Sequence, residues 1–158
     1  MATEIERKFL VTGDAWRQPN PVPFSQGYLN RDPERTVRVR LAGGQAFITI
    51  KGLTKGVSRL EFEYPIPVAD AEQLLLLCQG PIIKKARHIV VDSGTTWEVD
   101  EFFGENAGLV VAEVELDNEH QSFRRPSWLG QEVTEDPRYF NSNLTSNPFS
   151  TWHDRTEA

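Results

Sequence analysis

Polar and apolar residues alternate with a period of two along much of the chain, which is the pattern of β-strands with one buried face. Gly43 and Gly44 separate two such runs and supply the positive φ angles of a tight hairpin turn, and Ser93 with Gly94 marks a second hairpin. We expect about eight strands, at residues 4–11, 24–30, 36–41, 46–51, 59–66, 84–92, 96–103 and 109–116.

Helical signals are fewer. A leucine-rich segment at 68–78 ends before a Gly-Pro pair and predicts a short helix. Segments 119–125 and 137–144 predict two more, the latter opening with proline at a favoured early position. Residues 16–23 contain three prolines and are expected to form a loop. The tail, residues 147–158, is polar apart from Phe149 and Trp152. Either the tail is partly disordered, or these two aromatic side chains dock on the rest of the protein.

The charged side chains of the expected strands share one face of each strand. A merely solvated face usually mixes Ser, Thr, Asn and Gln with its charges, whereas this one carries mostly Glu, Arg and Lys. Its members are Glu4, Glu6, Lys8, Arg38, Arg40, Lys51, Arg59, Glu61, Glu63, Lys85, Arg87, Asp100, Glu113 and Glu115. The opposite face is apolar, with Ile5, Phe9, Val37, Val39, Ile48, Ile50, Leu60, Phe62, Val99, Val114 and Leu116.

This arrangement predicts a barrel with a charged interior and an apolar outer layer that helices and loops cover. Charges collected inside a barrel are costly unless a ligand or metal compensates them. The Arg and Lys side chains suit the oxygens of a polyanion, and the Glu side chains suit Mg²⁺ or Mn²⁺, which commonly shares its coordination with phosphates and water. Both sets together predict a metal and polyphosphate site. The simpler alternative is a solvated charged face with an unrelated small-ligand function.

Composition limits the remaining possibilities. A chain of 158 residues is expected to be one domain. The formal net charge of −6 argues against a nucleic-acid partner, and no apolar run is long enough to suggest a membrane partner. The single cysteine excludes an intramolecular disulfide and a zinc site of the cysteine type. The charged N-terminus lacks the apolar core of a signal peptide, so a cytoplasmic protein is expected.

The opening run from Glu4 to Phe9 resembles the Glu-x-Glu-x-Lys signature of the CYTH proteins, also called triphosphate tunnel metalloenzymes. That signature alone is weak, but further segments resemble the successive strand motifs and the C-terminal segment of that family in order. These are residues 26–29, 38–40, 49–51, 59–63, 85–87, 98–100, 112–115 and 132–141.

The resemblance implies a mainly β (α+β) fold, a closed eight-stranded antiparallel tunnel with a few flanking helices, over residues 1–146. It implies one or two Mg²⁺ or Mn²⁺ ions and a small-molecule triphosphate substrate. The short bacterial members that this chain resembles hydrolyse inorganic triphosphate, with weaker nucleoside triphosphatase activity. Class IV adenylyl cyclase and thiamine triphosphatase, both found in this family, remain alternatives, as does a non-catalytic polyphosphate or nucleotide binder. A monomer and a homodimer are both compatible with the sequence.

By position, the resemblance implies that Lys8, Arg38, Arg40, Lys51, Lys85 and Arg87 hold the triphosphate and that Glu4, Glu6, Glu113 and Glu115 hold metal. Glu61 and Glu63 would either bind metal or orient the basic side chains. Further hypotheses are that Lys8 and Tyr28 move a proton and that Asp100 fixes an arginine or ligates metal. Arg59 and Arg138 would contact substrate or pair with neighbouring carboxylates.

Overall fold

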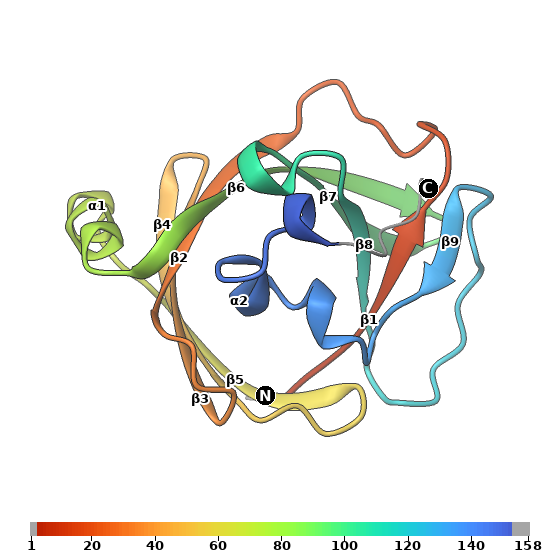
Figure 1. Cartoon of the computed structure of the whole chain (residues 1–158). Helices are drawn as coiled ribbons and strands as arrows, with labels where there is room; N and C mark the ends of the chain where they lie inside the picture. Colours follow the sequence, from red (N-terminus) through yellow and green to blue (C-terminus); the bar gives the residue numbers. More distant parts are fainter. Residues whose placement is uncertain (1–2, 153–158) are drawn as a thin grey trace.

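The computed structural model describes residues 3–152, in which nine antiparallel strands form one sheet. Eight of them close into a barrel in the order β5-β4-β3-β2-β6-β7-β8-β1, because β1 also pairs with β5 (Figure 1). The barrel strands are β1 (Thr3–Val11), β2 (Val22–Asn30), β3 (Arg35–Ala42), β4 (Gln45–Gly52), β5 (Ser58–Pro65), β6 (Gln79–Asp92), β7 (Thr95–Phe102) and β8 (Val110–Glu115). The expected closed eight-stranded antiparallel barrel is therefore confirmed.

A ninth strand, β9 (Leu129–Glu132), pairs with β1 outside the barrel and was not expected from the sequence. The helix expected at 119–125 is wrong, since these residues form an irregular segment. Phe123 of this segment packs edge-on against Phe9 and Trp97, with ring centroids 6.1 and 5.5 Å apart. Burial of this aromatic side chain on the barrel therefore replaces the helix.

The helix α1 (Val68–Leu76) matches the helix expected at 68–78, although it ends two residues earlier. It packs on β2, β3 and β4, where a small core forms around Val39, Ala46 and Ala71. β6 begins at Gln79 rather than at residue 84, so the Gly-Pro pair lies within a strand instead of ending a helix. Gly80 has a φ of +72°, a conformation that glycine adopts without strain.

The expectation that helices and loops cover the apolar outer layer is only partly met. Phe9, Trp97 and Trp128 are buried in a core outside β1, β7 and β8. On β5, however, Leu60 and Phe62 keep 54% and 41% of their surface exposed. The reason is the short reach of α1, which contacts the β2–β4 side of the barrel.

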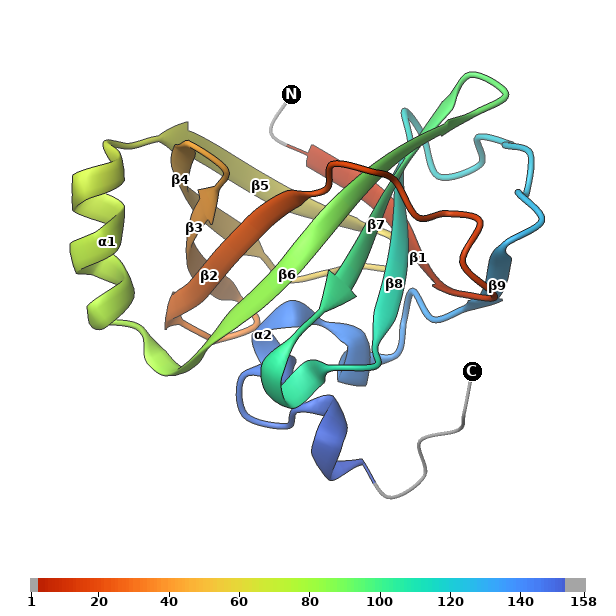
Figure 2. The same cartoon turned by 90° about the horizontal axis from the view of Figure 1, so that it is seen from above.

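The C-terminal segment closes one end of the barrel. A 3₁₀ helix (Pro137–Tyr139) and α2 (Asn141–Leu144) replace the single helix expected at 137–144, because Phe140 between them has an extended backbone. In Figure 1, α2 lies across the opening of the ring of strands, and Figure 2 shows it at one end of that ring. Phe149 and Trp152 dock against Tyr139, whereas residues 153–158 of the tail lie outside the described residues. None of the helices in 3–152 has the length and apolar character of a membrane span.

Candidate functional site

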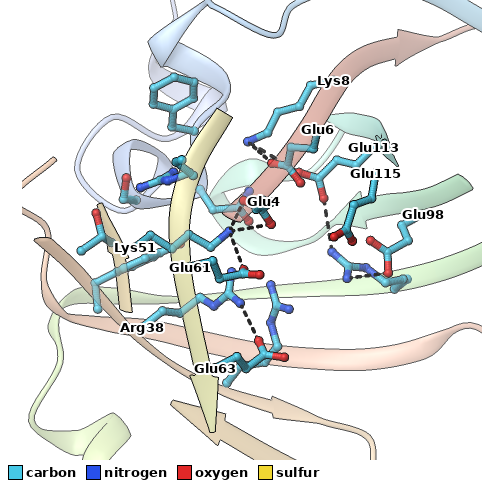
Figure 3. Close-up of a pocket in the computed structure, with 18 of the residues that line it drawn as sticks. Glu4, Glu6, Lys8, Arg38, Lys51, Glu61, Glu63, Glu98, Glu113 and Glu115 are labelled. Atoms are coloured by element: carbon cyan, nitrogen blue, oxygen red, sulfur yellow. Dashed lines mark hydrogen bonds and ion pairs between the residues drawn. The ribbon is translucent and has the colours of Figure 1, made fainter. Parts of the chain in front are cut away.

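The barrel encloses a cavity of about 170 Å³ whose lining is almost entirely charged. Seven barrel strands supply seven Lys or Arg and seven Glu side chains, and the C-terminal segment adds the uncharged Phe140, Asn141 and Ser142. Figure 3 shows the labelled side chains converging from different strands on one space. The lining residues are Glu4, Glu6, Lys8, Tyr28, Thr36, Arg38, Arg40, Lys51, Arg59, Glu61, Glu63, Lys85, Arg87, Glu98, Glu113, Glu115, Phe140, Asn141 and Ser142.

Positive charge gathers on β3 and β6, which flank β2. Arg38 and Arg40 come from β3, and Lys85 and Arg87 come from β6. Arg40 donates from Nε to the side-chain oxygen of Gln26 at 2.8 Å, and it forms no ion pair with a carboxylate of residues 3–152. Burial, together with the nearby guanidinium groups of Arg38 and Arg87, lowers the pKa of Arg40 to about 9. Arg40 is therefore the member of this basic wall whose charge no carboxylate of residues 3–152 pairs with, whereas Arg38, Lys85 and Arg87 each have an acidic partner.

Asp100 lies beneath the basic wall, only 1% exposed. It accepts hydrogen bonds from Nε and Nη2 of Arg87, both at 2.8 Å, and pairs with Nζ of Lys85 at 2.7 Å. Burial opposes ionisation, but Lys85 and Arg87 outweigh it and hold the pKa of Asp100 far below its usual range. One carboxylate therefore serves two cations, as the salt-bridge hypothesis for Asp100 requires.

Negative charge gathers on the other side, on β7, β8 and β1. Two pairs of carboxylates stand directly opposite each other across neighbouring strands, Glu98 with Glu113 and Glu6 with Glu115. Like charges in register are unfavourable unless something else neutralises them. Burial raises the pKa of Glu6 to about 8, with Glu113 and Glu4 adding to the effect. Burial also raises the pKa values of Glu98 and Glu115, so the charged forms of several carboxylates in this acidic wall are disfavoured.

Lys8 stands within the acidic wall. Its Nζ lies 3.6 Å from Glu113 and 4.0 Å from Glu6, and 5.3 Å from the centre of the Phe140 ring. Burial disfavours the charged amine, yet Glu113 and Glu6 outweigh burial and raise the pKa of Lys8. Lys8 and Arg87 in turn overcome burial and lower the pKa of Glu113 to about 2. Both groups are therefore charged at neutral pH.

Three further ion pairs link β4 and β3 to acids of β1 and β5. Lys51 donates to Glu4 at 3.1 Å and lies 3.3 Å from Glu61. Arg38 lies 3.5 Å from Glu63, which also accepts a hydrogen bond from Thr49 at 2.9 Å. Glu61 and Glu63 therefore hold basic side chains, one of the two roles considered for them.

The chemistry of the acidic wall fits a divalent metal ion. Glu4, Glu6, Glu113 and Glu115 are hard oxygen donors, and a cation bound beside Glu6 would oppose the burial and the neighbouring Glu113 and Glu4 that raise its pKa. Within residues 3–152, no three of these or other acidic, His or Cys side chains are already close enough to hold one ion. Substrate phosphates and water would therefore have to complete its coordination.

Every residue expected in the site lines the cavity except two. Asp100 lies below it, and Arg138 lies outside it, paired with Asp136 at 2.9 Å. Glu98 and Asn141 line the cavity but were given no role from sequence. Glu98 could have been found, because it stands two residues before Asp100 and so shares its face of β7. Asn141 comes from beyond the barrel strands, where strand periodicity gives no signal.

Known proteins share this architecture. The CYTH domain family profile matches residues 2–146. An inorganic triphosphatase of Acetivibrio thermocellus is 49% identical over 96% of this chain and 99% of its own length, and one of Nitrosomonas europaea is 39% identical over 90% and 96%. The crystal structure of the inorganic triphosphatase NE1496 is similar with a TM-score of 0.66 and 37% identity, over 92% of this chain and 95% of that one.

Proposed function

The chain belongs to the CYTH domain family, and from that premise we propose that it hydrolyses inorganic triphosphate to pyrophosphate and phosphate in a metal-dependent reaction. The observation that carries this proposal is the separation of charge in the cavity. In the basic wall, Arg40 forms no ion pair with a carboxylate of residues 3–152. In the acidic wall, Glu6 has a raised pKa and can either take up a proton or bind a metal ion. A polyanion and a divalent cation bound together would satisfy both walls.

Substrate binding falls to the basic side chains. Arg38, Arg40, Lys51, Lys85 and Arg87 surround the cavity from three strands and can contact several phosphate oxygens at once. Such a preorganised ring positions the chain of phosphates and neutralises charge that develops during phosphoryl transfer. Arg59 adds a further cation at the lining, held by a hydrogen bond from its Nε to the Gly52 carbonyl oxygen.

Glu4, Glu6, Glu113 and Glu115 would hold the metal, one or two ions of Mg²⁺ or Mn²⁺. Bound there, such an ion supplies charge neutralisation at phosphate oxygens and lowers the pKa of bound water. The carboxylates orient it, and the barrel wall keeps other solvent away from the phosphates.

Lys8 is suited to give a proton rather than to take one. Its pKa is raised, so it is charged at neutral pH, and it projects between the acidic wall and Phe140. In this position it can neutralise and protonate the departing pyrophosphate oxygen. Tyr28 lines the same cavity and also belongs to the core cluster with Ile83 and Phe102, so its hydroxyl is the second candidate for proton transfer.

Organic triphosphates are the second candidate substrates, and one observation favours them. A cavity of about 420 Å³ adjoins the tunnel and shares Thr36, Arg59, Phe140 and Ser142 with it. Leu53 and Pro33 make part of its lining apolar. A nucleoside or thiamine group attached to a triphosphate could occupy this cavity while the phosphates enter the tunnel.

Phosphate release from inorganic triphosphate, ATP and thiamine triphosphate distinguishes the candidates, with a parallel search for cyclic AMP. A preference for inorganic triphosphate supports the main proposal. A Leu53→Arg variant tests the adjoining cavity. It should leave KM for inorganic triphosphate and for the metal unchanged but should raise KM for ATP. Cyclic AMP as the main product from ATP would replace hydrolysis with cyclisation. Ligand binding without turnover would indicate a binding module.

We infer that residues 1–146 form the single functional domain and that the protein acts in the cytoplasm on a small-molecule substrate. Dependence of the specific activity on protein concentration tests whether a monomer or a homodimer is the active form. Nucleic acid added to the assay should not compete with triphosphate at equal phosphate concentration.

A further inference from the structure

Three cations of the basic wall surround one aromatic ring. The guanidinium carbons of Arg40 and Arg87 each lie 4.6 Å from the centre of the Phe24 ring, and Nζ of Lys85 lies 5.7 Å from it. Phe24 is buried on β2, between the strands that carry these cations. An aromatic face attracts cations without cancelling their charge. Lys85 and Arg87 also pair with Asp100, so Arg40 is the cation at Phe24 whose charge no carboxylate of residues 3–152 pairs with.

Two side-chain amides extend this arrangement. Gln26 is 0% exposed, accepts a hydrogen bond from Nε of Arg40 at 2.8 Å and donates from Nε2 to Oδ1 of Asn141 at 2.9 Å. The same oxygen of Asn141 accepts a second hydrogen bond from Nζ of Lys85 at 3.0 Å. A neutral chain of hydrogen bonds therefore runs from Arg40 through Gln26 and Asn141 to Lys85.

The donors on either side fix which way each amide points. Arginine and lysine donate but do not accept, so Gln26 must turn its oxygen to Arg40 and Asn141 must turn its oxygen to Lys85. The amide nitrogen of Asn141 then faces away from both donors. It has no hydrogen-bond partner among residues 3–152, and Asn141 lines the cavity.

The neutrality of these partners matters for the electrostatics. Elsewhere in the tunnel Lys51, Arg38 and Arg87 are held by carboxylates, which cancel part of their charge. Arg40 is held by an amide instead. Burial and the surrounding cations lower the pKa of Arg40 to about 9, and burial with Arg87 and Arg40 lowers that of Lys85 to about 7, even though Asp100 opposes the effect. Both groups gain from a bound anion.

We propose that Asn141 is a binding residue for a phosphate oxygen at the closed end of the tunnel, through its amide N–H donors, and that Gln26 is a positioning residue that aims Arg40 at the same phosphate without neutralising it. The inference rests on the proposed function in one respect, since the anion concerned is the triphosphate. It adds two neutral residues to the charged set, contributed by β2 and by the segment that closes the barrel.

Gln26→Glu is the most direct test, because it keeps the shape of the side chain but gives Arg40 a carboxylate. Calorimetric titration with sodium triphosphate in EDTA should show a dissociation constant raised at least about tenfold. The melting temperature should change little, because the ion pair that Arg40 gains offsets the lost hydrogen bond from Gln26 to Asn141. A purely structural role for Gln26 predicts the reverse, a lower melting temperature with an unchanged dissociation constant. Gln45→Glu, at the exposed start of β4, is the matched control and should bind as the wild type does.

Asn141→Asp tests the proposed binding of a phosphate oxygen by the Asn141 amide. The carboxylate still accepts from Lys85 and Gln26, but it offers no N–H donor and repels phosphate. We expect KM for triphosphate to rise at least about tenfold with the melting temperature retained. Asn147→Asp adds the same charge at an exposed position of the C-terminal segment and should leave KM unchanged. Wild-type affinity in both Gln26→Glu and Asn141→Asp would overturn the inference.

Binding and turnover measured on the wild-type protein distinguish a failure of this inference from a failure of the proposed function. If it binds triphosphate in EDTA but releases no phosphate with Mg²⁺, hydrolysis is rejected, and the ratio of variant to wild-type dissociation constants still decides the roles of Gln26 and Asn141. If it binds no triphosphate under either condition, both proposals are overturned.

Discussion

Arg87 and Asp100 stand directly opposite each other on β6 and β7 and form a bidentate ion pair, with Nε and Nη2 of the arginine each 2.8 Å from one carboxylate oxygen. Lys85 completes the group at 2.7 Å. Asp100 thus holds two of the cations that line the cavity in a buried part of the barrel. Removing a single member would leave buried charge without a partner.

We expect Asp100→Asn to lower the free energy of unfolding by about 3–5 kcal/mol, because it removes the one carboxylate among residues 3–152 that pairs with the buried Lys85 and leaves Arg87 with Glu98 and Glu113 alone. Urea denaturation followed by fluorescence would measure the loss. Glu34→Gln provides a surface control, since Glu34 pairs with the exposed Arg35 and such a surface pair contributes only about 0–1 kcal/mol. Equal losses in the two variants would contradict the importance of the buried group.

Glu6 is expected to lower stability at high pH in the absence of metal. Its pKa is about 8 in the folded protein, above the ordinary 4.5, so the folded state holds more protons between these values and stability falls as pH rises through them. Glu6→Gln should therefore raise the melting temperature at pH 8 in EDTA, by roughly 2–4 °C per kcal/mol of relief. It should also abolish metal-dependent turnover. A lower melting temperature at pH 8 would show that the wall is not strained by its charge.

Triphosphate binding without metal should weaken as pH rises above neutrality. Burial, with Arg87 and Arg40, sets the pKa of Lys85 at about 7, and a bound anion favours the protonated amine, so binding above pH 7 requires proton uptake. The dissociation constant should rise by up to about tenfold per pH unit from this group. Titrations in EDTA from pH 6.5 to pH 9 would measure the slope. In Lys85→Met the slope should become flatter, and an unchanged slope would assign the effect to another group.

A substitution at Lys8 should distinguish the contribution of its positive charge from that of proton transfer. Lys8→Arg keeps the positive charge beside Glu113 and Glu6 but cannot lose a proton, so it should retain KM for triphosphate while kcat falls by about 10²-fold or more. Steady-state kinetics with Mg²⁺ would give both values. A wild-type kcat in Lys8→Arg would mean that the residue supplies charge alone, with proton transfer left to Tyr28 or solvent.

Most of the charged site could be predicted from the sequence because strand periodicity determines which side chains face inward. Lys85, Arg87 and Glu113 needed only their parity along a strand to be placed in the barrel. The pairings are a different matter, since the register of neighbouring strands decides that Arg87 meets Asp100 rather than another acid. Asp100 was nevertheless expected to hold an arginine.

The features that the sequence did not predict depend on distant or neutral contacts. Gln26 and Asn141 are 115 positions apart, and neither amide carries a charge that marks it as part of an ionic site. The four-residue strand β9 pairs with the edge of β1 that lies opposite β8. Phe123 packs on the barrel through tertiary contacts that local propensity in 119–125 does not contain.

The most direct test of the account is the metal-dependent release of phosphate from inorganic triphosphate, compared between wild type and Glu6→Gln. We expect strong release by the wild type with Mg²⁺ or Mn²⁺, none in EDTA, weaker release from ATP, and no activity in a Glu6→Gln variant that remains folded. Turnover that persists in EDTA, or in Glu6→Gln at the wild-type rate, would contradict the pairing of an acidic, metal-holding wall with a basic, phosphate-holding wall.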